Sequence, residues 1–175
     1  EAYGDYDTVA DLTREMVLAC ARAIGRTVVC DGQVDLEQPW RSATLFELVS
    51  EAVGEEVGTG TTAEHLAELA VKHEVALQPG WSAGEIALEL FEKLVEHTLV
   101  QPTFVRDYPV DARPLARDHR DDPQLAEAWD LVIGGVELAT GYSELVDPVE
   151  QRRRLTEQSV KAAGGDPEAM QLDED

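Results

Sequence analysis

The stretch that decides the fold is residues 129–148, which read Trp-Asp-Leu-Val-Ile-Gly-Gly-Val-Glu-Leu-Ala-Thr-Gly-Tyr-Ser-Glu-Leu-Val-Asp-Pro. It holds two extended segments, an apolar one from Ala128 to Ile133 and a second one from Val136 to Leu145. Gly134 and Gly135 between them supply the free backbone of a turn or bulge. The stretch therefore predicts two neighbouring strands that meet at the glycines.

Polar side chains interrupt both segments. Asp130 lies in the first segment and Glu137 in the second, while Thr140, Tyr142 and Glu144 follow at intervals of two residues. On a strand, residues two apart share one face, so the last three should point the same way. Burying three unpaired polar groups would cost roughly a few kcal/mol each. A ligand that pairs with them would remove that cost, so we expect a binding face here.

Composition restricts the class of protein. The chain has 175 residues, 43% of them apolar, which suits one folded domain with a single core. Its net charge of −22 opposes nucleic-acid binding by this stretch and fits a small cationic ligand or a bound divalent metal. Cys20 and Cys30 lack metal-type spacing, which is typical of reduced cysteines in the cytoplasm. No apolar run is long enough for a membrane span, so we expect no membrane contact by this stretch.

The remaining pattern predicts helices packed on a mainly antiparallel sheet, an α+β fold. Asp31-Gly32 is a hairpin signal, and residues 99–105 read as a strand. Apolar spacing predicts helices over 8–25, 44–53, 63–73 and 82–97, and a basic helix that begins at Pro148. The expected N-cap of the first helix is Asp7 or Thr8. Its expected core stripe consists of Val9, Leu12, Met16, Val17, Cys20 and Ile24.

The segment from Gly134 to Pro148 resembles the late active-site strands of class II lysyl-tRNA synthetases. The resemblance continues in Gln101-Pro-Thr-Phe, in Tyr108-Pro109 and in Pro114-Leu-Ala, and it runs over nearly the whole chain. It implies the class II synthetase sheet. It also implies that residues 1–175 are a single partial catalytic domain, from the end of motif 2 to the strands before motif 3, in a parent protein that forms a homodimer.

The implied reaction joins lysine and ATP to lysyl-adenylate and then transfers the lysyl group to tRNA(Lys), which is bound by parts outside this stretch. By resemblance, Asp130 and Glu137 hold Mg²⁺ and ATP. Glu144, as a buried carboxylate, binds the ε-ammonium of lysine. Tyr142 packs on the lysine methylenes or forms a hydrogen bond near the substrate, and Thr140 offers a hydroxyl nearby. The resemblance implies no catalytic residue beyond these binding residues. The simpler alternatives are that Asp130 only pairs with a local arginine, that Tyr142 is a core aromatic and that Thr140 is a plain strand residue.

Two departures from the family pattern concern the site itself. Asp130 and Thr140 stand where the family usually has Glu and Asn. Together with residues 148–154 and the linker Ala163-Gly-Gly-Asp-Pro-Glu-Ala-Met, they resemble the synthetase half of bifunctional lysylphosphatidylglycerol synthetases. Arg152, Arg153 and Arg154 are expected to pair with local acids, with RNA or phosphate contact as the alternative.

Three functions remain open at this point. The first is a lysine–tRNA ligase, and the second is the synthetase half of a membrane enzyme that produces lysylphosphatidylglycerol. The third is a non-catalytic synthetase paralogue that acts as a binding module. We expect the 175 residues to be inactive alone, because the arginines that clamp ATP in motifs 2 and 3 lie outside them.

Overall fold

The computed structural model describes residues 2–163 and shows a four-stranded sheet with helices around it, an α+β fold. The strands lie in the order β3 (Arg41–Thr44), β4 (Thr103–Pro109), β5 (Leu125–Ile133) and β6 (Val136–Tyr142). β4, β5 and β6 are antiparallel neighbours, but β3 runs parallel to β4. The parallel pair arises because three helices separate β3 from β4 in the chain, and such a crossover returns the chain in the same direction.

The β5–β6 hairpin confirms the prediction from residues 129–148. Gly134 and Gly135 both have positive φ, 65° and 74°, which is the left-handed backbone of a tight turn. A Cβ at Gly135 would also come within 2.8 Å of the His97 carbonyl oxygen. The turn therefore needs glycine for its conformation and, at Gly135, for a close backbone approach.

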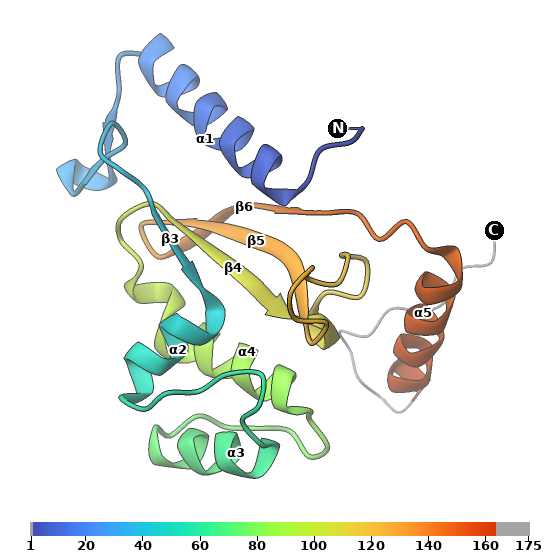
Figure 1. Ribbon diagram of the computed structural model, residues 1–175. Helices are drawn as coiled ribbons and strands as arrows, with labels where there is room; N and C mark the ends of the chain where they lie inside the picture. Colours follow the sequence, from blue (N-terminus) through green and yellow to red (C-terminus); the bar gives the residue numbers. More distant parts are fainter. Residues whose placement is uncertain (1, 164–175) are drawn as a thin grey trace.

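A layer of three helices covers one face of the sheet (Figure 1). The helices are α2 (Leu45–Val53), α3 (Ala63–Lys72) and α4 (Ala83–Leu94), and a 3₁₀ turn, η2 (Glu96–Thr98), follows α4. Thr44 and Ser82 begin α2 and α4 with complete capping boxes. The helices bury a continuous apolar core that includes Leu45, Leu48, Val49, Leu66, Leu69, Ile86, Leu90 and Phe91. These helices and their core stripes agree with the apolar spacing of the sequence, although α4 ends three residues earlier than expected.

Helix α1 (Tyr6–Ala23) packs on the other face of the sheet, but with a different side than the sequence predicts. Its buried residues are Tyr6, Ala10, Thr13, Leu18 and Ala21. The predicted core stripe is wrong for Leu12, Met16 and Ile24, which are 57%, 57% and 72% exposed, and for Cys20, which is exposed as well. This side of α1 faces the sheet because the small side chain of Ala10 lets the helix lie close to the strands. Trp129 holds the helix there through a 2.8 Å hydrogen bond that its indole N–H donates to the Tyr6 carbonyl.

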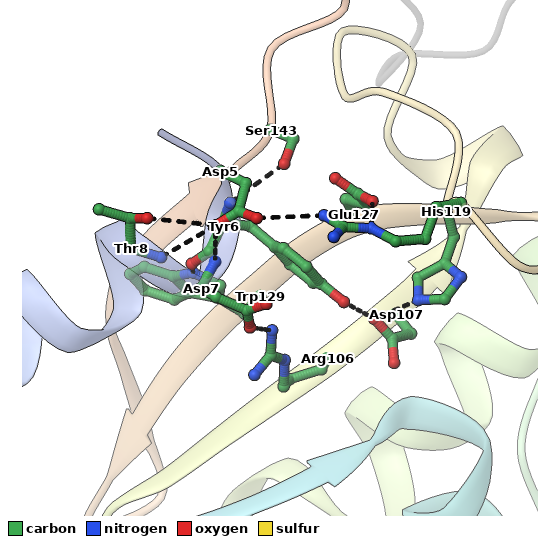
Figure 2. Close-up of polar contacts among 11 residues, drawn as sticks. Asp5, Tyr6, Asp7, Thr8, Arg106, Asp107, His119, Glu127, Trp129 and Ser143 are labelled. Carbon is green, nitrogen blue, oxygen red and sulfur yellow. Dashed lines mark hydrogen bonds and ion pairs between the residues drawn. The ribbon is translucent and has the colours of Figure 1, made fainter. Parts of the chain in front are cut away.

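Polar contacts fix the start of α1 on the sheet (Figure 2). The N-cap is Asp5, not Asp7 or Thr8, and its carboxylate accepts hydrogen bonds from both of their amides. The Tyr6 hydroxyl donates to Asp107 at 3.1 Å, and the Tyr6 amide donates to the Ser143 hydroxyl at 3.0 Å. These contacts hold α1 against both β4 and the segment after β6.

Arg120 adds a charged link between the start of α1 and the sheet. Its guanidinium donates to Glu127 of β5 at 2.6 Å and to Asp5 at 3.2 Å. Glu127 is 1% exposed, so Arg120 serves as the counter-ion of a carboxylate that lies inside the protein. Burial alone would raise the pKa of Glu127, but the hydrogen bonds from Arg120 and Ser143, together with the charges of Arg120 and Arg117, outweigh burial and lower that pKa.

Two peripheral elements complete the described chain. A small hairpin pairs β1 (Val28–Val29) with β2 (Val34–Asp35) through Asp31 and Gly32, which have positive φ as predicted, although each strand has only two residues. Helix α5 (Pro148–Ala163) docks through Arg154, which is 5% exposed and donates to the Ala116 carbonyl. The linker predicted at 163–170 lies outside the described residues from Gly164 onward.

Candidate functional site

The register of β5 and β6 brings the predicted site residues of these strands to one face of the sheet. Asp130 lies opposite Thr140, and Ala128 lies opposite Tyr142. A register shift after Leu131 then places Glu137 opposite Val132. Because directly opposed residues of an antiparallel pair point to the same side, Asp130, Glu137, Thr140 and Tyr142 share the face that α4 partly covers.

Asp130 and Glu137 line a common pocket at the end of α4. The pocket has a volume of about 90 Å³. Its lining residues come from α4, η2, β4, β5, β6 and the turn after β4: Leu88, Phe91, Glu92, Glu96, Tyr108, Arg113, Asp130, Val132 and Glu137. The two carboxylates that the sequence assigns to Mg²⁺ and ATP are thus neighbours in space.

The Asp130 carboxylate is buried and only half satisfied. The residue is 4% exposed, and one oxygen, Oδ2, forms an ion pair with Arg113. The other oxygen, Oδ1, is buried without a hydrogen-bond partner among the described residues. Asp130 therefore does pair with a local arginine, as the simpler alternative expects. The pair uses only one of the two carboxylate oxygens and leaves Oδ1 without a partner within the described chain.

Arg113 is the residue of this site that sequence reasoning missed. It follows the 3₁₀ turn η3 (Val110–Ala112) at the end of β4, and its guanidinium lies 4.2 Å from the centre of the Tyr108 ring. The family pattern does not mark it, although Pro114-Leu-Ala follows it directly, and its partner Asp130 is 17 residues away along the chain. Only the fold brings the two together.

Glu137 lies at the rim of the pocket. The residue is exposed overall, but partial burial of its carboxylate, followed by the charge of Asp130, raises its pKa. Tyr108 below it is 1% exposed, and burial together with Asp130 raises its pKa well above the usual value. A carboxylate with a raised pKa beside a second carboxylate indicates a place where a cation would be stabilised.

The residues assigned to lysine are more exposed than expected. Tyr142 is 37% exposed, which excludes the core aromatic of the simpler alternative within this structure. Thr140 is exposed and donates a long hydrogen bond of 3.4 Å to the Trp129 carbonyl. The expectation of a buried carboxylate at Glu144 is wrong for the described chain, because Glu144 is exposed and follows the end of β6, the edge strand of the sheet.

The donor set of the pocket fits a magnesium nucleotide better than a metal ion held by protein alone. Within residues 2–163 no group of three or more metal-binding side chains is close enough to hold an ion. Mg²⁺, however, commonly uses one or two carboxylates and takes its other ligands from water and substrate phosphates. Asp130, with its unused oxygen, and Glu137 at the rim supply that number of carboxylates.

The described helices include none with the length and apolar content needed to cross a membrane.

The ion pairs of Arg153 and Arg154 agree with the expected role of these residues. Arg153 contacts Glu150 and Glu157, and Arg154 contacts Glu150 and Asp118, so both arginines serve local acids.

Comparison with known proteins places the chain among synthetases. The family model described as tRNA synthetases class II (D, K and N) matches residues 1–175. A lysylphosphatidylglycerol biosynthesis bifunctional protein LysX from Gordonia bronchialis is 47% identical over 99% of this chain and 16% of its own length. Proteins of the same name from Mycobacterium avium and Nocardia farcinica are 49% and 48% identical over 100% of the chain, again 16% of their own lengths. The chain thus spans about one sixth of these relatives.

Proposed function

This chain belongs to the class II tRNA synthetase family, and we propose that it is part of the lysine-activating unit of a bifunctional lysylphosphatidylglycerol-forming protein. The observation that carries the proposal is the identity of 47–49% to proteins named for lysylphosphatidylglycerol biosynthesis, over 99–100% of the chain. These relatives favour the second of the three functions over a lysine–tRNA ligase without a lipid product.

The proposed chemistry has three steps. The lysine carboxylate attacks the α-phosphate of ATP, which releases pyrophosphate and gives lysyl-adenylate. A hydroxyl at the end of tRNA(Lys) then takes the lysyl group, and AMP leaves. Finally, a hydroxyl of phosphatidylglycerol accepts the lysyl group from the tRNA at a membrane, in a part of the parent protein outside this cytoplasmic stretch.

Asp130 and Glu137 are the proposed ligands of magnesium and, through it, of ATP. Both line one pocket, and Asp130 Oδ1 has no protein partner within the described chain. Bound Mg²⁺ would supply positive charge against the negative charge that grows on the phosphate oxygens. The carboxylates themselves would orient the nucleotide, since β5 and β6 hold them at fixed positions of a paired sheet.

Glu144, Tyr142 and Thr140 are the proposed contacts of the lysine substrate. Tyr142 and Thr140 share the sheet face of Asp130, and Glu144 continues the same segment beyond the end of β6. A carboxylate there would pair with the ε-ammonium, and it would be left unpaired by an uncharged analogue. Such a site rejects analogues that lack the charge.

The experiment that tests the lipid step uses the longest native chain that contains these residues. It is incubated with lysine, ATP, Mg²⁺ and tRNA(Lys), together with vesicles that contain phosphatidylglycerol. Lysine incorporated into the lipid, and lost when tRNA is digested, supports the proposal. If lysyl-tRNA forms without lysyl lipid, the protein is a lysine–tRNA ligase without a lipid product. If neither lysyl-tRNA nor lysyl lipid forms, the result favours the non-catalytic paralogue.

A further inference from the structure

The pocket at the end of α4 contains four carboxylates and a single basic side chain among its lining residues. The carboxylates belong to Glu92, Glu96, Asp130 and Glu137, and the basic residue is Arg113. Proximity of like charges without a cation is unfavourable, and Asp130 lies deepest among them with 4% exposure. Arg113 is therefore the basic side chain of this pocket lining that offsets the charge of Asp130.

Arg113 is held only in part. One terminal nitrogen forms the ion pair with Asp130 Oδ2, and the guanidinium stacks 4.2 Å from the centre of the Tyr108 ring. Its Nε is buried without a hydrogen-bond partner among the described residues, as is Asp130 Oδ1. Each partner of this ion pair thus keeps one unused polar atom, and the arginine side chain is 30% exposed.

We propose that Arg113 is the resident counter-ion of Asp130, which keeps this carboxylate in place until a divalent cation displaces it. The inference rests on the proposed function in one respect, namely that Asp130 and Glu137 receive magnesium. Two cations on one carboxylate repel each other, so the bound guanidinium and an incoming Mg²⁺ compete. The 30% exposure of Arg113 leaves it a way out towards solvent.

This competition has a consequence for the order of binding. Free Mg²⁺ offers nothing to the displaced guanidinium, whereas a magnesium nucleotide also brings phosphates with which an arginine pairs well. Free Mg²⁺ should therefore bind weakly, and the magnesium nucleotide should bind as a unit. Arg113 is in this view a positioning residue that acts through Asp130.

The test is calorimetric titration of the longest native chain with Mg²⁺ alone, without nucleotide or lysine. In Arg113→Gln the competing charge is gone, so the dissociation constant for Mg²⁺ should fall on the order of tenfold. The matched control is Arg41→Gln on β3, which removes the same charge from an exposed pair with Glu51 of α2 and should leave the constant unchanged. An unchanged constant in Arg113→Gln, or an equal fall in both variants, would overturn the inference.

A second variant covers the case in which Arg113→Gln does not fold. Arg113→Lys keeps the charge but loses the flat contact with the Tyr108 ring and the fork geometry of the guanidinium. Its hold on Asp130 should be weaker, and the dissociation constant for Mg²⁺ should fall about threefold. A constant equal to that of the unchanged protein would contradict the proposed role.

The result is separable from that of the proposed function, because Mg²⁺ affinity is measured without catalysis. If the unchanged protein activates lysine but Arg113→Gln has the same Mg²⁺ affinity, only the counter-ion role of Arg113 is overturned. If Arg113→Gln binds Mg²⁺ more tightly but the unchanged protein does not activate lysine, the counter-ion role is supported and the proposed function is overturned.

Discussion

At the scale of single residues, the sequence predicts which residues form the site better than it predicts their contacts and their burial. Asp130, Thr140 and Tyr142 come to one face because alternation along two paired strands fixes the face of each side chain, and alternation is visible in the sequence. Glu137 joins that face only through the register shift after Leu131, which alternation does not show. Arg113 could not be predicted, since its contact depends on the path of an irregular turn. The predicted burial of Glu144 is wrong, because this residue lies beyond the end of β6 and its side chain is exposed.

Glu144→Gln should weaken lysine binding much more than ATP binding. The substitution removes the charge proposed to pair with the ε-ammonium, and a charge-assisted hydrogen bond is worth about 1.5–3 kcal/mol, or roughly ten- to a hundredfold in affinity. Equilibrium dialysis of each ligand with the longest native chain measures the two effects. Equal losses for lysine and ATP would contradict the assigned role of Glu144.

Gly141→Ala should destabilise the fold. Gly141 lies opposite Trp129, and a Cβ there would come within 2.3 Å of the indole ring, which is fully buried. Overpacking of this kind costs about 1–3 kcal/mol. Urea denaturation measures the loss, and Gly58→Ala is the matched control because a Cβ at Gly58 meets nothing within 4 Å. Equal stability of the two variants would show that the Trp129 ring can move aside.

At the scale of elements, local signals predict the helices well and their buried faces less well. The cap residues Thr44 and Ser82 act within one turn, so the sequence around them suffices to place α2 and α4. The buried side of α1 depends instead on the hydrogen bond from Trp129 to Tyr6 and on the pair of Arg120 with Asp5, each between residues far apart in the chain. For that reason the apolar spacing predicts a core position for Leu12 and Met16, although both face outward.

The docking of α5 should weaken as the pH falls from about 4.5 towards 2. Hydrogen bonds from Arg153, and then from Arg154, lower the pKa of Glu150 to about 2. A lowered pKa means that this carboxylate stabilises the folded state above its ordinary pKa of 4.5 and loses that effect as it is protonated. The protection factors of the α5 amides, which compare the measured exchange rate with the intrinsic rate at the same pH, should therefore fall over this range.

Substitution tests the same contact at neutral pH. Glu150→Gln should accelerate exchange in α5, because Arg154, buried at 5% exposure, loses one of its two carboxylate partners. Glu157→Gln is the control, since Glu157 is exposed and its recorded ion pair is with Arg153 alone. Similar exchange rates in the two variants would mean that Glu150 does not dock the helix.

At the scale of the whole molecule, the α+β class follows from the sequence, whereas the parallel pairing of β3 with β4 does not. The pattern shows strands and helices but not which strands become neighbours, and β3 meets β4 only after a crossover through three helices. The net charge of −22 likewise argues against nucleic-acid binding by this stretch without indicating where the acids gather. The structure concentrates four of them in one pocket around Arg113.

The central claim is that the parent protein activates lysine. The most direct test is ATP–pyrophosphate exchange by the longest native chain that contains these residues, with lysine, ornithine or arginine as the amino acid. Exchange stimulated by lysine, and not by the other two, is the predicted result. Absence of exchange with all three would contradict the claim, and Asp130 and Thr140, which replace the usual Glu and Asn, would be the first residues to restore.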